Sequence, residues 1–311
     1  MDSTAKSRVA IILVNWNGFD FTVACLNSLR NLDYPDFGII LVDNASDNQE
    51  GAILQKQFPE IELVQSQSNL GFAGGNNLGI RSALKQGFSH VMLLNNDTVV
   101  VSDFLDEMLL VFEKYPSVGV VQPLIYWMKD RNQIWSAGGK WNAWLGRAIT
   151  RLELKKIKYA KIGFHKLDWA TGCCMLISKE AILQAGLLNE QYFAYFEDVE
   201  WSLRFIEKGF EIALSPQAII YHEAGASSKK SHSEGTLSPR VFYYHVRNQF
   251  FLIRTAVSLI HKPFAFGYHL IRFGFWAAYF AVRGRFKKLK SVAKGIWDGF
   301  TLPVQSPEKW L

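Results

Sequence analysis

Short, uninterrupted apolar runs that end in polar residues are the feature that most restricts how this chain can fold. VAIILV (9–14), GIILVD (38–43) and HVMLLNND (90–97) are each long enough for one strand. Strands without a polar face are typical of parallel sheets that helices cover on both sides. The stretches FDFTVACLNSLRNLDYP (19–35) and NLGIRSALKQG (77–87) carry apolar residues at helical spacing. This alternation predicts an α/β fold with a mostly parallel, doubly wound sheet.

The rest of the chain carries further periodic segments. In chain order, the patterns predict a helix near 51–58, a strand at 61–64, a helix over 104–115, a strand at 118–123, loops or a small antiparallel ribbon over 127–166, a strand and short helix over 169–186, a helix over 195–209, and two strands at 211–216 and 218–225. The polar segment 226–236 is a candidate mobile loop and boundary. Beyond it the chain reads as helical, so we expect two parts, 1–236 and 237–311.

Composition indicates a folded protein and favours one cellular compartment. The chain has 311 residues, of which 49% are hydrophobic and 20% charged, unlike disordered or collagen-like chains. Cys25, Cys173 and Cys174 are odd in number and lack metal-ligand spacing, which favours a reducing compartment. The apolar run VAIILV is too short for the core of a signal peptide. We therefore expect a cytoplasmic protein.

The positive charge is concentrated near the end of the chain. The net charge is +6, and the stretch from Arg240 to Asp298 contains one acidic residue, Asp298 itself. RGRFKKLKSVAKGIWDG (283–299) predicts a helix with an apolar side and a basic side, which suits an anionic membrane surface. Packing on the rest of the protein and a dimer contact are the alternatives. His269 and Arg272 interrupt the apolar stretch 264–282, so we expect no membrane span and a peripheral position at the inner face of the cell membrane.

Polar side chains gather where the first strands end. They are Asn15 and Asn17, then Asp43 and Asn44, then Asn95, Asn96 and Asp97. Open parallel sheets bind ligands at the carboxyl ends of their strands, so one pocket can collect these side chains. A lone carboxylate among amides, such as Asp97, suits a hard divalent cation that takes its other ligands from phosphates and water. The alternative is a helix N-cap, for which Asp103 is better placed.

Two further stretches can carry chemistry. NLGFAGGNNLGI (69–80) places glycines before a predicted helix, where they form either an anion site or a tight turn. It is neither G-x-G-x-x-G nor a P-loop. In FEDVEW (196–201), one of the adjacent carboxylates Glu197 and Asp198 can be a general base, or both can be an acidic first turn. His222 ends an apolar strand and is either a core residue or a ligand.

Together these stretches resemble the family 2 glycosyltransferases of the GT-A fold, especially the rhamnosyltransferase-like branch. The resemblance runs from about Val9 to Asn248. The motifs that carry it, in order, are VNWNG, LVDNASDN, NLGFAGGNNLGI, LLNNDT, WATGCCMLISKEA, YFEDVEW, HEAGASS and YYHVRN. It implies a GT-A catalytic domain over 1–236, followed by the helical region 237–311.

The resemblance also implies roles for individual residues. Asp97 would bind a divalent metal, Mn²⁺ or Mg²⁺, and His222 would join its coordination shell. Asn95 stands where relatives carry the first Asp of D-x-D, and Asn189 stands where relatives often carry Asp. Asp198 would be the general base. The donor nucleotide would contact Asn15, Asn17, Asp43, Asn69, Gly71, Gly74, Asn77 and Asn96. The acceptor or the donor sugar would contact Trp169, Gly172 and Glu197.

The expected function is that of an inverting, metal-dependent glycosyltransferase. One displacement assisted by one base inverts the anomeric centre. By resemblance, the donor is a nucleoside-diphosphate sugar, with dTDP-rhamnose favoured over UDP-sugars. The acceptor is a glycan or lipid-linked glycan, and no nucleic acid is involved. A nucleotidyltransferase that forms sugar nucleotides and a non-catalytic carbohydrate- or membrane-binding module are the alternatives.

Overall fold

The computed structural model describes residues 7–156, 165–223 and 234–306. Most of the polar segment 226–236, expected to be a mobile loop, lies outside these residues. The boundary at residue 236 therefore stays a prediction.

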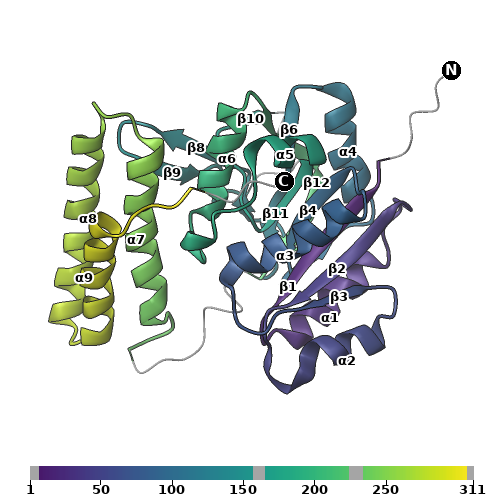
Figure 1. Cartoon of the computed structure of the whole chain (residues 1–311), viewed down its shortest axis with the longest axis horizontal. Helices are drawn as coiled ribbons and strands as arrows, with labels where there is room; N and C mark the ends of the chain where they lie inside the picture. Colours follow the sequence, from purple (N-terminus) through teal and green to yellow (C-terminus); the bar gives the residue numbers. More distant parts are fainter. Residues whose placement is uncertain (1–6, 157–164, 224–233, 307–311) are drawn as a thin grey trace.

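One mixed sheet runs through the body of the molecule (Figure 1). Its strand order is β10-β12-β6-β11-β4-β1-β2-β3, with β5 beside β12 and β7 beside β6. The strands are β1 (Val9–Asn15), β2 (Phe37–Asp43), β3 (Glu62–Gln65), β4 (His90–Asn95), β5 (Thr98–Val100), β6 (Val118–Trp127), β7 (Ile134–Ser136), β10 (His165–Leu167), β11 (Cys174–Ser178) and β12 (Glu211–His222). β1 pairs in parallel with β2 and β4, whereas β11 runs antiparallel between β4 and β6. The expected mostly parallel α/β sheet is confirmed.

Helices cover both faces of this sheet and create two cores. They are α1 (Phe19–Leu29), η1 (Asp47–Gln49), α2 (Glu50–Gln57), α3 (Gly71–Lys85), α4 (Phe104–Lys114), α5 (Lys179–Ala185), η3 (Glu190–Tyr192) and α6 (Glu197–Glu207). Successive side chains of β1 point to opposite faces. Ile11 and Leu13 join the core under α1, α2 and α4, and Ala10 and Ile12 join the core under α3, α5 and α6. The ribbon expected in 127–166 is present as β8 (Gly139–Asn142) and β9 (Arg147–Thr150).

Two expectations about individual elements are wrong. The stretches 211–216 and 218–225 are not two strands, because β12 is one strand with a register shift between Ser215 and Ile219. Both of its halves pair with β6, so the shift interrupts the ladder without ending it. In addition, α3 begins at Gly71 and not near Asn77, which places the glycine-rich motif inside the helix.

A separate group of helices, α7 (Pro239–Ala256), α8 (Lys262–Val282) and α9 (Phe286–Thr301), stands beside the sheet (Figure 1). It has its own core, which includes Val246, Phe250, Phe273 and Val292. α7 faces the sheet-containing body, where Leu252 packs in a cluster with Trp169 and Val199. Within the described part of the chain, no helix combines the length and the apolar character needed to cross a membrane.

The division of α9 into an apolar and a basic side is only partly correct. Lys288 is buried, whereas Phe286 is 60% and Trp297 is 69% exposed. Close packing of α9 on α7 explains why Lys288 points inward while Phe286 and Trp297 point outward. A Cβ at Gly295 would lie 2.9 Å from the backbone oxygen of Tyr243, so a glycine allows the two helices to approach closely at this point.

Candidate active site

The carboxyl ends of β1, β2 and β4 meet at one edge of the sheet, as their parallel pairing requires. Asn15 ends β1, Asp43 ends β2, and Asp97 lies in the turn that follows β4. All three side chains are buried. The start of β11 lies at the same edge, because Cys174 pairs with Leu94 near the end of β4.

Asn15 and Asn96 hold the loops of this edge together. The Asn15 amide Nδ2 donates to Ser46 Oγ at 3.0 Å and to Glu50 Oε2 at 2.9 Å. Asn96 Nδ2 donates to Thr22 Oγ1 at 2.8 Å. Because Asn15 is fully buried and its amide is already bonded, its side chain has a structural role in this arrangement.

Asn17 and Asp43 lie on either side of the loop that follows β2. Asn17 has φ of 52° and accepts a hydrogen bond from the Asp47 backbone N–H at 2.8 Å. Asp43 Oδ1 accepts from the Ser46 backbone N–H at 3.2 Å. A Cβ at Gly51 would lie 2.7 Å from Asp43 Cβ, so α2 can pass this close to the carboxylate only with glycine there.

In the glycine-rich motif only Gly71 adopts a turn-type positive φ, because Gly74, Gly75 and Gly79 lie inside α3. Gly71 has φ of +72°, which a glycine adopts without strain. The backbone N–H groups of Phe72 and Ala73 both donate to the Phe193 carbonyl oxygen, at 2.7 and 3.3 Å, and Asn69 Oδ1 accepts from Gly71 N at 2.8 Å. These donors are therefore already bonded and are not free for a phosphate in this arrangement.

Asn77 and Gly74 connect α3 to the segment that precedes α6. Asn77 Nδ2 donates to the Leu188 carbonyl oxygen at 2.9 Å and its Oδ1 accepts from Leu188 N at 3.1 Å. A Cβ at Gly74 would approach Glu190 Oε2 at 3.6 Å. Both polar atoms of the Asn77 side chain are therefore bonded within the protein, and the expected donor contacts at Asn77 and Gly74 stay predictions.

Asp97 faces His222 across the β5–β12 pairing. Asp97 Oδ1 lies 3.0 Å from His222 Nε2. The geometry is not that of a hydrogen bond, and among the described residues neither Asp97 Oδ1 nor either ring nitrogen of His222 has a hydrogen-bond partner. Leaving such atoms buried without partners costs about 1–3 kcal/mol each. A buried carboxylate and imidazole this close to each other, with no hydrogen bond from either to another described residue at these atoms, supply an oxygen and a nitrogen that a divalent cation can bind.

The alternative role of Asp97 as a helix cap is excluded, because Asp103 occupies the N-cap position of α4. Within the described residues, no group of three or more His, Cys, Asp or Glu gathers as a complete metal site. The Asp97–His222 pair would therefore need further ligands from outside the chain. The Trp135 ring lies edge-on to His222 with centroids 4.5 Å apart, a neighbour that sequence reasoning missed.

Asp198 lies at the start of α6, directly against β11. Its Oδ2 accepts from the Gly172 backbone N–H at 2.9 Å and its Oδ1 from Val199 N at 2.8 Å. A Cβ at Gly172 would lie 2.7 Å from the Phe72 ring, so a glycine allows this backbone to pass close to α3. Removal from water raises the pKa of Asp198, and the Gly172 and Val199 N–H groups oppose that rise.

Glu197, the neighbour of Asp198, is buried, and its Oε2 has no hydrogen-bond partner among the described residues. Burial, and then the Asp198 charge, raise the pKa of Glu197 well above its ordinary value. Two adjacent carboxyl groups in different surroundings can hold one proton between them.

Cys173 shows that the two halves of the site are close. Burial raises the pKa of the Cys173 thiol well above its ordinary value, and the charges of Asp97 and Asp198 raise it further. Both carboxylates therefore act on one side chain at the start of β11. The Asn95 N–H donates to the Cys173 carbonyl oxygen at 2.8 Å and the Gly172 N–H donates to Asp198 Oδ2 at 2.9 Å, so backbone contacts place Asp97 and Asp198 at the same edge of the sheet.

Arg247 and Asn248 of α7 were not predicted as site residues. Asn248 Nδ2 donates to the carbonyl oxygens of Tyr192, Ala194 and Tyr195 at 2.9, 2.8 and 2.8 Å, and Arg247 donates to Tyr192 and its neighbour Gln191. Three non-glycine residues of this segment have positive φ, which costs about 1–3 kcal/mol each. They are Phe193, Tyr195 and Phe196. The sequence signal that could have indicated these two residues is an arginine and an amide inside the mostly apolar stretch VFYYHVRNQFFLI.

Trp169 packs inside the protein at this site. Its ring lies in the cluster with Val199 and Leu252, and its Nε1 donates to the Lys140 carbonyl oxygen at 3.2 Å. The ring also covers Gly139, where a Cβ would clash with it. Trp169 thus packs between α6, α7 and β8, and the expected sugar contact stays a prediction.

A sequence model of Glycosyl transferase family 2 matches residues 10–185, more than half of the chain. The chain belongs to this family. The matched region includes the strand ends that carry Asn15, Asp43 and Asp97, as well as Gly172. The expected resemblance to family 2 glycosyltransferases is confirmed.

Curated relatives of this family 2 chain act on several sugars. Agl10 of Haloferax volcanii, a low-salt glycan biosynthesis hexosyltransferase, is 26% identical over 66% of this chain and 63% of its own length. RfbF of Shigella flexneri, a dTDP-rhamnosyl transferase, is 24% identical over 67% of this chain and 69% of its own. An N-acetylglucosaminyl-diphospho-decaprenol L-rhamnosyltransferase of Mycobacterium tuberculosis is 23% identical over 63% of this chain and 68% of its own. The chain thus spans less than two thirds of Agl10.

Solved structures show the same fold. S. aureus TarS 1–349 in complex with UDP-GlcNAc superposes with a TM-score of 0.60 at 17% identity, over 94% of this chain and 81% of that one. GalNAc-T7 with UDP, GalNAc and Mn²⁺ superposes with a TM-score of 0.57 at 15% identity, over 69% of this chain and 43% of that one. The expected GT-A fold with a C-terminal helical region is confirmed.

Proposed function

We propose that this family 2 member is an inverting, metal-dependent glycosyltransferase that moves a sugar from a nucleoside diphosphate to a hydroxyl group of a glycan or lipid-linked glycan. The observation that supports the proposal is that Asp97, His222 and Asp198 lie at one edge of the sheet. Family membership favours this reaction over the formation of sugar nucleotides.

Asp97 and His222 would hold the divalent cation, Mn²⁺ or Mg²⁺. When bound, the cation neutralises the charge that develops on the departing diphosphate. The buried Asp97 carboxylate and the His222 imidazole would supply an oxygen and a nitrogen ligand, and the remaining ligands would come from phosphate oxygens and water. The structure of GalNAc-T7 contains Mn²⁺ together with UDP, which supports this assignment.

Asp198 would accept the proton of the acceptor hydroxyl. As the acceptor oxygen attacks the anomeric carbon, the bond from that carbon to the diphosphate oxygen breaks and the diphosphate leaves with the electron pair. The Gly172 N–H fixes one carboxylate oxygen of Asp198. Its raised pKa makes the carboxylate a stronger base than an ordinary aspartate.

We propose dTDP-rhamnose as the preferred donor, because RfbF is a dTDP-rhamnosyl transferase and the mycobacterial relative is an L-rhamnosyltransferase. The complex of TarS with UDP-GlcNAc makes a UDP-sugar the second candidate. A lipid-linked acceptor follows from the diphospho-decaprenol acceptor in the mycobacterial relative's name. The region over 1–236 would be the catalytic domain.

A donor-hydrolysis and transfer assay tests the reaction. The protein is incubated with radiolabelled dTDP-rhamnose or UDP-GlcNAc and a lipid-linked disaccharide acceptor, with Mn²⁺ or with EDTA. Transfer with inverted configuration that requires the metal supports the proposal. Equal transfer in EDTA, or a retained anomeric configuration, contradicts it.

A further inference from the structure

One side of α8 is apolar along its whole length and faces away from the protein. Phe264, Ile271, Phe275 and Val282 recur at helical spacing and are 60%, 65%, 72% and 86% exposed. We call these four residues the α8 stripe. Figure 1 shows α8 in the helical group at the side of the molecule away from the sheet. A helix that is apolar on all sides is normally buried on all sides.

The other side of α8 is fully used for packing. Ala265, His269, Phe273 and Phe280 are buried against the remaining helices and the β8–β9 ribbon. His269 Nε2 lies 3.0 Å from the Leu145 carbonyl oxygen, which fixes the rotation of the helix about its axis. The α8 stripe is therefore held outward by contacts on the opposite side.

The apolar surface continues around the start of α8. Leu259 and Ile260, in the turn between α7 and α8, are 82% and 74% exposed. Trp144, in the turn between β8 and β9, is 61% exposed, and its ring lies 4.0 Å from that of His261. Exposed tryptophan and aliphatic side chains are enriched where proteins enter the interfacial layer of a bilayer.

Cations flank this surface, and acidic side chains are absent from the corresponding sequence. From Arg240 to Trp297 the sequence contains no Asp or Glu. Arg283 and Lys290 are exposed near the far end of the α8 stripe. An apolar strip beside basic residues matches a bilayer that contains anionic phospholipids.

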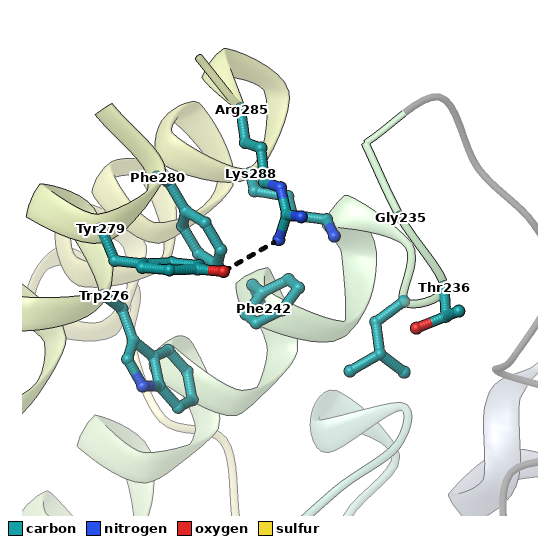
Figure 2. Close-up of a pocket in the computed structure, with 9 residues that line it drawn as sticks. Gly235, Thr236, Phe242, Trp276, Tyr279, Phe280, Arg285 and Lys288 are labelled. Atoms are coloured by element: carbon teal, nitrogen blue, oxygen red, sulfur yellow. Dashed lines mark hydrogen bonds between the residues drawn. The ribbon is translucent and has the colours of Figure 1, made fainter. Parts of the chain in front are cut away.

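A recess beside the α8 stripe also combines apolar and basic side chains (Figure 2). This cavity of about 500 Å³ lies between α7, α8 and α9. Phe242, Trp276 and Tyr279 supply aromatic walls, and Arg285 and the buried Lys288 also line it. The Lys288 Nζ donates to the Glu234 carbonyl oxygen at 2.7 Å. Arg285 Nη1 lies 3.5 Å from the Tyr279 hydroxyl. Aromatic walls beside the partly exposed Arg285 guanidinium suit the phosphate headgroup and upper acyl region of a lipid.

We propose that the α8 stripe docks this protein on an anionic phospholipid surface, with α8 lying in the plane of the interface. A second copy of the chain is the competing occupant. A two-fold dimer through this surface would bring equivalent basic patches together, since each patch would face or border its own copy. Arg283 and Lys290 form no salt bridge with another described residue, whereas Glu234 accepts from the backbone N–H groups of Lys287 and Lys288 and Asp298 pairs with Lys294. The proposal stands independently of the enzymatic reaction.

Vesicle flotation of the full chain tests this docking. The vesicles contain either phosphatidylcholine alone or equal parts of phosphatidylcholine and phosphatidylglycerol. We expect binding to the mixed vesicles that weakens as salt is added. The double variant Ile271→Ser/Phe275→Ser should bind at least about tenfold more weakly, because two exposed apolar side chains no longer enter the bilayer. The variant Arg283→Gln/Lys290→Gln should lose about fivefold per charge.

Matched variants on the sheet-containing body serve as controls. Leu110→Ser removes an apolar side chain that is 51% exposed on α4, and Lys56→Gln/Lys85→Gln removes two exposed charges from α2 and α3. Neither should change flotation. Unchanged thermal unfolding of the stripe variant excludes misfolding as the cause of its lost binding.

Several results would overturn the proposal. One is equal binding of the wild type to neutral and mixed vesicles, and another is unchanged binding of Ile271→Ser/Phe275→Ser. A third is a wild-type dimer in light scattering that Ile271→Ser/Phe275→Ser converts to a monomer while flotation stays the same. The last result would assign the α8 stripe to a second copy of the chain.

Discussion

Asn95 donates its backbone N–H to the carbonyl oxygen of Cys173 at 2.8 Å. This bond joins the end of β4 to the start of β11. Asp97 follows Asn95 by two residues, and Gly172, which donates to Asp198, precedes Cys173. A rigid sheet contact therefore fixes the two carboxylates relative to each other, and helix packing alone does not determine their separation.

Replacing Asp198 by Asn should abolish turnover while donor binding persists. The amide oxygen can keep one of the two backbone bonds that Asp198 accepts, from Gly172 N or Val199 N, and a melting curve checks that the variant is folded. The amide can no longer take a proton. We expect kcat to fall by about 10²–10⁴. Donor affinity, measured by calorimetry, should stay within about twofold, because a base on the acceptor side adds little to ground-state binding.

Glu207→Gln is the matched control, because Glu207 is an exposed carboxylate of the same helix. It should leave kcat unchanged.

In the wild type, kcat/KM should decrease as the pH falls through the raised pKa of the Glu197–Asp198 pair, because protonation removes the base. Asp198→Asn with wild-type turnover would remove this residue from the mechanism.

Asn248→Ala should impair catalysis through the segment that Asn248 holds. Its amide bonds three carbonyl oxygens of residues 192–195, and their loss should cost about 1–3 kcal/mol of unfolding free energy. The segment leads directly into Asp198, so kcat and the acid limb of its pH profile should both change.

Gln249→Ala tests whether stability alone explains the effect of Asn248→Ala. Gln249 is also a buried amide of α7, and its Nε2 donates to the Gly146 carbonyl oxygen at 2.8 Å, away from Asp198. It should lower the melting temperature with an unchanged pH profile of kcat. Identical kinetic changes in the two variants would show that Asn248 acts only on stability.

Glu197→Gln should stabilise the protein toward neutral pH. The pKa of Glu197 is raised in the folded state, so the folded protein binds a proton more tightly than the unfolded chain. Stability therefore falls as the pH rises from the ordinary glutamate value through the raised value. The neutral amide removes that loss. The melting-temperature difference between variant and wild type should grow from acid to neutral pH, and a difference independent of pH would refute the assignment.

Two glycines should respond to alanine in opposite directions. A Cβ at Gly79 would lie 2.5 Å from Ile12 Cγ2 of β1, so Gly79→Ala should destabilise by about 1–3 kcal/mol. Gly274 lies in α8 with nothing within 4 Å of such a Cβ, and Gly274→Ala should stabilise by about 1 kcal/mol. Denaturant unfolding measures both, and a stabilised Gly79→Ala would contradict the close packing of α3 on β1.

The elements of the sheet-containing body were predictable because their signals are local. VAIILV and GIILVD have no polar face, so they had to become covered parallel strands such as β1 and β2. The edge where Asp43 and Asp97 gather followed from parallel pairing. The extent of α3 was not predictable, because glycines signal a turn unless a neighbour such as Ile12 requires close approach.

Side-chain roles depended on contacts across long sequence separations. Nothing near Asn15 in the sequence indicates that Ser46 and Glu50 occupy its amide. The same holds for Trp169, whose partner Lys140 lies on the ribbon. In the C-terminal region the sequence pointed to α9 as the membrane helix, but packing on α7 turns Lys288 inward and leaves α8 with the apolar exposed side.

The central claim is that Asp97 binds a divalent cation that contacts the donor diphosphate. Its most direct test is calorimetric titration of dTDP and of UDP into the protein, once with Mn²⁺ and once with EDTA. The titrations compare the wild type, Asp97→Asn and Asp103→Asn. Asp103 is an exposed carboxylate that begins α4 and provides the control. The account predicts that Mn²⁺ tightens binding of one diphosphate at least about tenfold in the wild type and in Asp103→Asn, and that Asp97→Asn loses this gain. Equal affinity with and without Mn²⁺ in the wild type, or an undiminished gain in Asp97→Asn, would contradict it.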